Sequence, residues 1–312
     1  MLVNPEHVPV LADQAVSFLE AAGVPGNGKI VDCTLGLGGY SEKILRTFPQ
    51  VQVYALDRDP AAVEIAEARL TGHGPRFRAF RANFGAMEEV LAEYAPLDAF
   101  VFDLGVSNMQ LADGERGFSF QNDGPLDMRM DSSGAGITAA NLLESLSAEE
   151  LTEIFWLYGE ERHSRRIAAG IAEHRRRKGP LKTTGELVGL IREILPAPVQ
   201  RKMGGHPARR VFQALRIRVN DELGELEAGL LAAAGLVSPG AVVVVVSYHS
   251  LEDRVVKHTF RTWEREEKRG KALAKRPVLP SAEEIEANFK ARSAKLRAFQ
   301  FSDICELKQT RR

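Results

Sequence analysis

Short apolar runs that end in turn-forming residues alternate along the chain with segments of helical periodicity. Such runs lie at residues 30–31, 51–57, 77–82, 97–103 and 241–247. The last of these is a continuous valine run, which is typical of a parallel strand buried on both faces. Phe299 and Phe301 instead alternate with polar neighbours, as expected of an antiparallel edge hairpin. The alternation of strands and helices predicts an α/β fold with a mostly parallel sheet.

The pattern becomes purely helical between residues 138 and 204. Two capping boxes, at 147–150 and 183–186, begin helices there, and a third helix is expected at 160–178. We therefore expect a helical domain over 138–204, inserted between the fourth and fifth strands. Residues 1–137 and 205–312 would then form the core, with 196–207 as the return linker. Residues 110–131 show neither period, which predicts a long loop of the kind that often carries function.

A glycine-rich turn follows the first strand. Asp32 ends the strand, Gly36, Gly38 and Gly39 follow it, and a helix is expected from Ser41. Glycine lets the backbone lie against a ligand, and the helix offers free N–H groups and a positive dipole end. In an open α/β sheet, ligands bind at this edge. The turn therefore predicts a ligand site.

A second acid narrows the class of ligand. Asp57 ends the next strand, at about the spacing from the turn at which a carboxylate accepts bonds from ribose hydroxyls. A nucleoside-bearing cofactor is therefore expected. Asp32 would repel the pyrophosphate of a dinucleotide, whereas it would attract the ammonium group of S-adenosylmethionine. This contrast favours a methyltransferase over an oxidoreductase.

Two further side chains stand at strand ends. Asp103 closes the apolar run 97–103, and a buried carboxylate needs a partner to offset its desolvation, so a functional role is favoured over a structural one. Phe84 follows the third strand. It fits equally well as a core residue and as a ring that stacks on adenine.

Composition limits the class of protein. The 312 residues are 44% hydrophobic, contain no apolar run long enough to span a bilayer, and begin without the features of a signal peptide. Cys33 and Cys305 give neither a disulfide framework nor metal-ligand spacing, which favours a reducing cytoplasm and no metal. Net charge is −1, but residues 160–218 hold 15 Lys and Arg against five Asp and Glu. That block predicts a polyanionic partner.

Several blocks together resemble one family, the bacterial ribosomal RNA small subunit methyltransferase H. The matching stretches are 7–11, 32–39, 103–107, 115–120, 126–131, 212–217, 247–254 and 293–297. The resemblance implies a Rossmann-like methyltransferase fold with a seven-stranded sheet, plus the helical insertion. It implies transfer of a methyl group from S-adenosylmethionine to the N4 of a cytidine in 16S rRNA of the small ribosomal subunit, at the decoding-centre position 1402.

The resemblance also implies where the cofactor binds. Its contacts would fall on Gly38, Gly39, Tyr40, Asp57, Phe84, Asp103 and Gln110. Tyr40 departs from the family pattern, which commonly has His there. A backbone contact would survive that change, whereas a side-chain contact would not be assured.

Cytosine N4 is a poor nucleophile, so the enzyme must hold it in line with the methyl group and accept an N–H bond. Asp103 is the candidate acceptor, although it could equally hold the cofactor. Ser247, Tyr248 and His249, at the fifth strand end, are the next candidates for contacting the substrate. Carbon-5 methylation would need an attacking cysteine, and neither cysteine lies at these strand ends.

The basic helices complete the functional hypothesis. Arg175, Arg176 and Arg177 are expected to help dock the RNA. Two alternatives stay open, an NAD-dependent oxidoreductase and a non-catalytic RNA-binding protein. The first does not explain the basic insertion, and the second gives the acids at the strand ends no function. Sequence leaves the oligomeric state open between a monomer and a homodimer.

Overall fold

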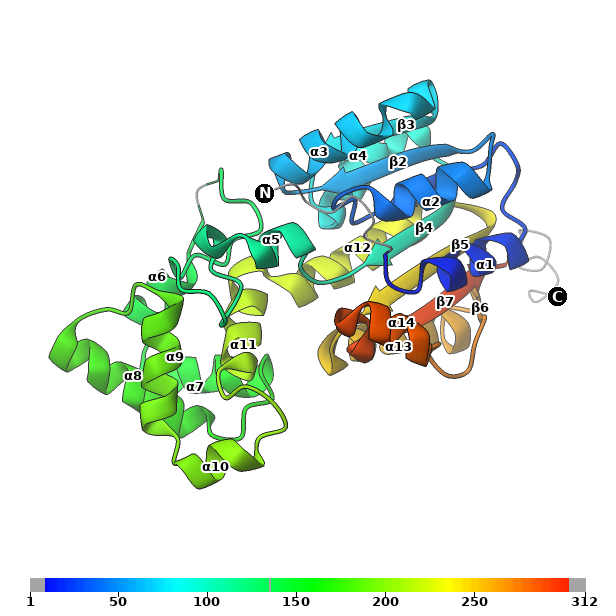
Figure 1. The fold of residues 1–312 in the computed structure, drawn as a ribbon. Coiled ribbons are helices and arrows are strands. Elements are labelled where there is room, and N and C mark those ends of the chain that lie inside the picture. The colour runs from blue at the N-terminus through cyan, green and yellow to red at the C-terminus, as the bar shows by residue number, and fades with distance from the viewer. Residues whose placement is uncertain (1–8, 135, 303–312) are drawn as a thin grey trace. The chain divides into compact units, whose positions relative to one another are not determined.

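The computed structural model describes residues 9–134 and 136–302, which divide into two compact units. The core unit lies within residues 1–105 and 223–312, and the helical unit spans Val106–Glu222. His7 and Cys305 lie outside the described residues. Figure 1 shows the helices and strands of each unit.

The described part of the core unit contains a seven-stranded sheet of order β3-β2-β1-β4-β5-β7-β6. Strands β1 to β5 are parallel, β7 is antiparallel to β5, and β6 pairs with β7 at the edge. The expected antiparallel edge hairpin is therefore confirmed. The strands are β1 Lys29–Asp32, β2 Gln52–Asp57, β3 Phe77–Arg81, β4 Leu97–Asp103, β5 Val237–Ser247, β6 Gly270–Ala272 and β7 Lys295–Phe301.

Helices cover both faces of this sheet (Figure 1). Alternate residues of a strand serve opposite faces, so Val243 packs with α12 and α13 while Val244 packs with α1 and α2. Pro60 begins α3, and Asp59 caps it by accepting a bond from the Ala61 N–H at 3.2 Å. The helices are α1 Ala12–Ala21, α2 Gly39–Thr47, α3 Pro60–Leu70, α4 Met87–Leu91, α12 Glu222–Leu236, α13 Ser250–Arg265 and α14 Ala282–Ala287.

The helical unit has an apolar core of its own, contributed by most of its helices. Both predicted capping boxes are confirmed, because Ser147 and Thr183 each exchange bonds with the residue three positions later. The helices are α5 Asn108–Ala112, α6 Ala139–Ser145, α7 Ala148–Leu157, α8 Ser164–Lys178, α9 Thr184–Ile194, α10 Ala197–Lys202 and α11 Arg209–Asn220. Among the described residues, no helix combines the length and apolar character needed to cross a bilayer.

The boundaries predicted for the insertion, 138 and 204, are too narrow. Leu126 and Met128 lie in the predicted loop, yet both are buried in the core of the helical unit. Phe212 and Leu215 of α11 are buried in the same core. The unit therefore begins at Val106 and extends through α11. The expected return linker is part of it and contains α10.

Arg175 serves the helical unit itself. Its Nη1 donates to the carbonyls of Leu143 and Glu144, both at 2.7 Å, and of Leu146 at 2.8 Å. These carbonyls lie at the C-terminal end of α6, where the last turn of a helix has no intrahelical donors. Arg176 and Arg177, by contrast, are exposed and share one carboxylate, that of Glu173.

We predict that Arg175→Ala destabilises the helical unit and that Arg176→Ala does not. The first change leaves three carbonyls without a charged donor, which costs about 1–3 kcal/mol. The second removes an exposed ion pair and should change stability by less than about 0.5 kcal/mol. Urea unfolding followed by circular dichroism compares the two variants. Equal stabilities would show that Arg175 does not hold α6.

Candidate functional site

Three carboxylates meet at one edge of the sheet. Asp32, Asp57 and Asp103 are the last residues of β1, β2 and β4, which are neighbours in the order β2-β1-β4. The strands run parallel and in register, with Asp32 opposite Ala55 on one side and Val101 on the other. The sequence prediction that these acids share one edge is confirmed.

Asp32 organises the turn that follows β1. It is fully buried, and its Oδ1 accepts a bond from the Thr34 N–H at 3.2 Å. Its Oδ2 accepts from the N–H of Ser41 at 3.1 Å and from the hydroxyl of Ser41 at 2.7 Å. Both oxygens are therefore used to join the turn to the first residues of α2. The attraction of Asp32 for an ammonium group stays a prediction.

Asp57 holds the same turn from the neighbouring strand. Its Oδ2 accepts from the Gly36 N–H at 2.8 Å, and its Oδ1 accepts from the Asp59 N–H at 2.9 Å. Gly38 follows at φ +82°, and a Cβ there would lie 3.0 Å from Leu70 Cδ1. A side chain at Gly38 would therefore strain the backbone and crowd α3. Each Asp57 oxygen keeps a second lone pair with which to accept a ligand hydroxyl.

Asp103 connects the turn to the end of β5. Its N–H donates to Thr34 Oγ1 at 2.7 Å, and its Oδ1 accepts a bond from the Tyr248 hydroxyl at 2.6 Å. Gly105 follows with φ +97°, and the ring of Tyr248 would lie 3.4 Å from a Cβ there. Tyr248 was a secondary candidate in the sequence. The structure brings it into contact with Asp103.

The strand ends are electronegative. Burial, together with the nearby charges of Asp32 and Glu252, raises the pKa of Asp103 to about 7, while the bond from Tyr248 and the charge of Lys290 oppose the rise. Burial likewise raises the pKa of Asp32 to about 6, against the bond from the Ser41 hydroxyl, and raises that of Asp57. Within the described residues, none of the three forms an ion pair. A cationic ligand would relieve this concentration of negative charge.

The side chain of Tyr40 bonds to the segment before α1. Its ring is buried, and its hydroxyl donates to the carbonyl of Val10. Pro9 lies next to the same helix start, 3.3 Å from where a Cβ of Gly39 would be. The residue that departs from the family pattern therefore fastens the segment before α1 onto α2. The cofactor contact expected of Tyr40 stays a prediction.

Phe84 and Gln110 lie in different units. Phe84 is half-buried and packs edge-on against Phe102, with ring centroids 5.6 Å apart, and Gly229 leaves room for its ring. These contacts are those of a core residue. Gln110 belongs to the helical unit, where its side chain accepts a bond from the Ser107 N–H at 3.1 Å in a capping box. The cofactor contacts expected of both residues stay predictions.

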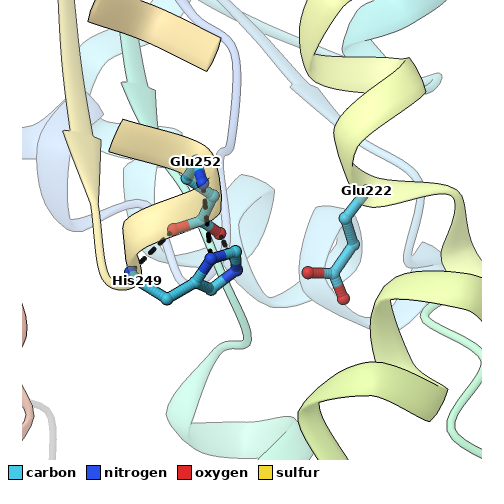
Figure 2. A group of neighbouring side chains, drawn as sticks. All are labelled: Glu222, His249 and Glu252. Atoms are coloured by element: carbon cyan, nitrogen blue, oxygen red, sulfur yellow. Dashed lines mark hydrogen bonds and ion pairs between the residues drawn. The ribbon is translucent and has the colours of Figure 1, made fainter. Parts of the chain in front are cut away.

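His249 caps α13. Its Nδ1 accepts from the Glu252 N–H at 3.3 Å, and its Nε2 lies 3.1 Å from Glu252 Oε1 (Figure 2). Glu252 Oε2 accepts in return from the N–H groups of Tyr248 at 2.7 Å and His249 at 3.2 Å. Glu222, also drawn, belongs to the helical unit and pairs there with Arg216 at 2.7 Å. These contacts give His249 a helix-capping role, and the substrate contact expected of it stays a prediction.

Ser247 is also used within the fold. It is buried at the end of β5, and its hydroxyl donates to the Lys295 carbonyl on β7 at 3.3 Å. Cys33 is buried as well, and burial together with the Asp32 charge raises the pKa of its thiol well above the usual value. Neither side chain offers a nucleophile. The substrate contact predicted for Ser247 has no support in its bonds.

The sheet order, the antiparallel β7-β6 pair and the acids at the ends of β1, β2 and β4 together define a Rossmann-like, S-adenosylmethionine-dependent methyltransferase. The turn and Asp57 suit a nucleoside, and the cluster of carboxylates suits a ligand with sulfonium and ammonium charges. The pyrophosphate of a dinucleotide would meet the same carboxylates with repulsion. The class of cofactor expected from the sequence is therefore confirmed.

The chain belongs to the MraW methylase family, whose model matches residues 4–302. A relative from Cyanothece sp., named ribosomal RNA small subunit methyltransferase H, is 46% identical over 300 residues, covering 96% of each chain. The family that the sequence blocks resemble is thereby confirmed.

Solved structures give weaker similarities. An rRNA methylase from Streptococcus thermophilus matches at a TM-score of 0.45 with 10% identity, covering 97% of this chain and 99% of that one. A protein from Streptococcus mutans, solved in complex with SAH, matches at 0.45 with 9% identity, covering 96% and 99%. TM-scores below 0.5 do not establish a shared fold, so the assignment rests on the sheet order and the family.

We predict that Asp57→Ala weakens binding of S-adenosylmethionine by about 1.5–3 kcal/mol, because it removes a charged acceptor of ribose hydroxyl bonds. Asp98→Ala is the matched control. Asp98 also holds backbone and side-chain donors, Lys29 N–H at 2.8 Å and Ser238 Oγ at 2.6 Å, but it lies near the start of β4. Calorimetry measures both affinities. Undiminished binding by Asp57→Ala, or an equal loss in the control, would remove Asp57 from the cofactor site.

Proposed function

We propose that this protein transfers a methyl group from S-adenosylmethionine to the exocyclic N4 of a cytidine in 16S rRNA, within the small ribosomal subunit in the cytoplasm. The observation that carries the proposal is the Asp103–Tyr248 pair at the strand ends of a MraW-family methylase. The name of the Cyanothece relative supports rRNA of the small subunit as the substrate. Cytidine 1402 of the decoding centre is the position that the family resemblance implies.

The chemistry of cytosine N4 explains why a carboxylate is needed. The lone pair of N4 is delocalised into the ring, so the amine attacks poorly unless it is held in line with an electrophile. Bound S-adenosylmethionine supplies an electrophilic methyl group. As N4 forms its bond to carbon it becomes more acidic, and an ionised Asp103 can accept its N–H bond and take the departing proton. A pKa of about 7 suits both tasks near neutral pH.

Tyr248 positions and tunes this carboxylate. Its hydroxyl donates to Oδ1 of Asp103, which leaves Oδ2 to face a substrate. The same bond favours the ionised form, which lowers the pKa of Asp103 against the effect of burial. Tyr248 is itself held by the capping of α13, since Glu252 accepts a bond from its N–H. The cap at His249 therefore supports the acceptor indirectly.

Competing readings fit less well. Carbon-5 methylation needs a thiolate nucleophile, and the Cys33 thiol is buried with a raised pKa. An NAD-dependent oxidoreductase would place a pyrophosphate against this cluster of carboxylates. A non-catalytic RNA-binding protein would give the half-buried Asp103–Tyr248 pair no function.

The helical unit offers a surface for RNA that differs from the one expected. Arg175 is used to hold α6, and Arg176 and Arg177 share Glu173. Residues 192–209 instead expose Arg192, Arg201, Lys202 and Arg209, while Glu193 is the only acid between 187 and 220.

An aromatic pair lies beside these cations. The rings of Phe120 and His206 stack with centroids 4.6 Å apart and an interplanar angle of 11°, and Arg192 contacts His206 at 2.9 Å. Burial, followed by the Arg192 charge, lowers the pKa of His206, which keeps its ring neutral at pH 7. Aromatic rings beside basic side chains suit unpaired RNA. We assign RNA docking in the helical unit to this face.

Mass spectrometry of rRNA nucleosides tests the reaction. Cells that lack the protein should lose N4-methylcytidine from 16S rRNA, and the purified protein should restore it on their small subunits with S-adenosylmethionine. The matched control is the Asp103→Asn protein, which should restore none. Appearance of 5-methylcytidine, or an unchanged nucleoside profile, would contradict the proposal.

The pH dependence of activity tests the acceptor. Because a protonated Asp103 cannot accept the N–H, kcat/KM for the cofactor should fall as pH decreases through about 7. Tyr248→Phe removes a bond that lowers the pKa of Asp103, so in this variant kcat/KM should begin to fall at a higher pH. Asp103→Asn should lose activity by about 10²–10⁴-fold. If activity falls at the same pH in Tyr248→Phe as in the wild-type protein, Tyr248 does not influence the pKa of Asp103.

A further inference from the structure

One face of α13 carries a row of cations. Arg254, Lys257, Arg261 and Arg265 are exposed and spaced by three, four and four residues, so they lie along one side of the helix. Eleven residues of helix span about 16 Å. We call this row the α13 stripe.

The opposite side of α13 fixes the orientation of the stripe. Val256, Phe260 and Trp263 are buried in the core of the sheet, where Phe260 and Trp263 pack on Phe299 of β7 at centroid distances of 5.4 and 5.3 Å. Helix α13 therefore cannot rotate without exposing three large apolar side chains. The stripe is held facing away from the sheet.

The acids of α13 do not neutralise this face, because each has a task within the core unit. Glu252 completes the cap at His249. Asp253 pairs with Lys295 at 3.2 Å and Arg297 at 2.7 Å on β7, and Glu264 accepts a bond from the Ala272 N–H of β6 at 3.2 Å. An ordinary solvated helix face carries both signs of charge. Here the acids of α13 are engaged with the fold, while Lys257, Arg261 and Arg265 are exposed.

The stripe begins at the methyl-transfer edge. Helix α13 starts at Ser250, two residues after the tyrosine that bonds Asp103, and it runs from there along the sheet. We propose that the α13 stripe binds the phosphate backbone of the RNA strand that leads to the methyl-transfer site. This inference rests on the proposed function and adds a binding surface on the core unit, separate from that of the helical unit.

Phosphates suit the stripe for two physical reasons. A row of cations repeated about every 5.4 Å on a rigid helix can neutralise successive charges of a polyanion. Arginine and lysine also bind phosphate without reading bases, which leaves the choice of nucleotide to the site at the strand ends. The stripe would therefore strengthen RNA binding and orient the strand, without selecting the nucleotide that is methylated.

The test compares two double variants of the full-length protein. Lys257→Gln with Arg261→Gln removes two charges from the stripe. Lys43→Gln with Arg46→Gln removes two charges from α2, which covers the other face of the sheet, where these cations already pair with Asp13 and Glu42. Binding to purified small subunits that lack the methyl group is measured between about 0.05 and 0.2 M salt. Methylation and S-adenosylmethionine affinity are measured in parallel.

If both stripe cations contact phosphates, the slope of log affinity against log salt should flatten by about 1.4–1.8, at roughly 0.7–0.9 per contact. KM for the subunit should rise, most strongly at low salt, while kcat and cofactor affinity stay at wild-type values. The α2 variant should keep the wild-type slope. This combination would support the stripe as a phosphate-binding surface.

Three results would overturn the inference. An unchanged slope in the stripe variant would show that the cations are merely solvated. Equal flattening in both variants would show a general effect of net charge. Failure of the wild-type protein to bind or methylate small subunits would overturn the proposed function together with the stripe, whereas wild-type methylation with an unchanged slope removes the stripe alone.

Discussion

The complete burial of one carboxylate, Asp32, is the constraint on which the site depends. Removing a charged group from water is costly, and burial raises the pKa of Asp32 to about 6. Three bonds from Thr34 and Ser41 offset part of that cost. They can form only if the chain turns after β1 and brings the first residues of α2 back beside Asp32. The cofactor turn is therefore built before any ligand arrives.

The same turn also positions Asp103 and Asp57 through hydrogen bonds. Thr34, held by its own N–H bond to Asp32, accepts the N–H of Asp103 through its hydroxyl, and Gly36 donates to Asp57. Three carboxylates are thereby gathered at one edge without an ion pair among the described residues. Negative charge of this kind destabilises the fold as pH rises, because the buried acids bind protons more tightly when folded. The same negative charge that lowers the stability of the fold attracts a cationic cofactor to this edge.

The sheet was predictable because its determinants are local. Continuous apolar runs that end in Asp identified β2 and β4 and placed their acids. The boundary of the helical unit was not predictable in this way. Leu126 and Met128 are apolar residues in a polar, aperiodic segment, and nothing local shows that they are buried against helices that follow later in the chain.

Roles that depend on distant partners were also missed. A run of arginines looks the same whether it meets phosphate or a helix end, and Arg175 is distinguished only by α6, about 30 residues earlier. The Tyr40 hydroxyl donates to the Val10 carbonyl, which lies 30 residues away in the sequence. The Tyr248 hydroxyl donates to Asp103, which lies at the end of the neighbouring strand. One cue for His249 was available, since Glu252 stands three residues later in the spacing of a capping box.

The insertion between β4 and β5 has a consequence for biosynthesis. Asp103 pairs with Val246, so 143 residues separate these neighbouring positions of the sheet. At synthesis rates of about 5–20 residues per second, β4 leaves the ribosome roughly 7–30 s before its partner strand exists. During that interval Phe100 and Phe102 stay uncovered, because Leu226 and Leu230, which pack in the same core, have not yet been synthesised. The helical unit has its own core and can fold meanwhile. A nascent chain stalled within it would therefore present an unpaired, apolar strand edge to chaperones.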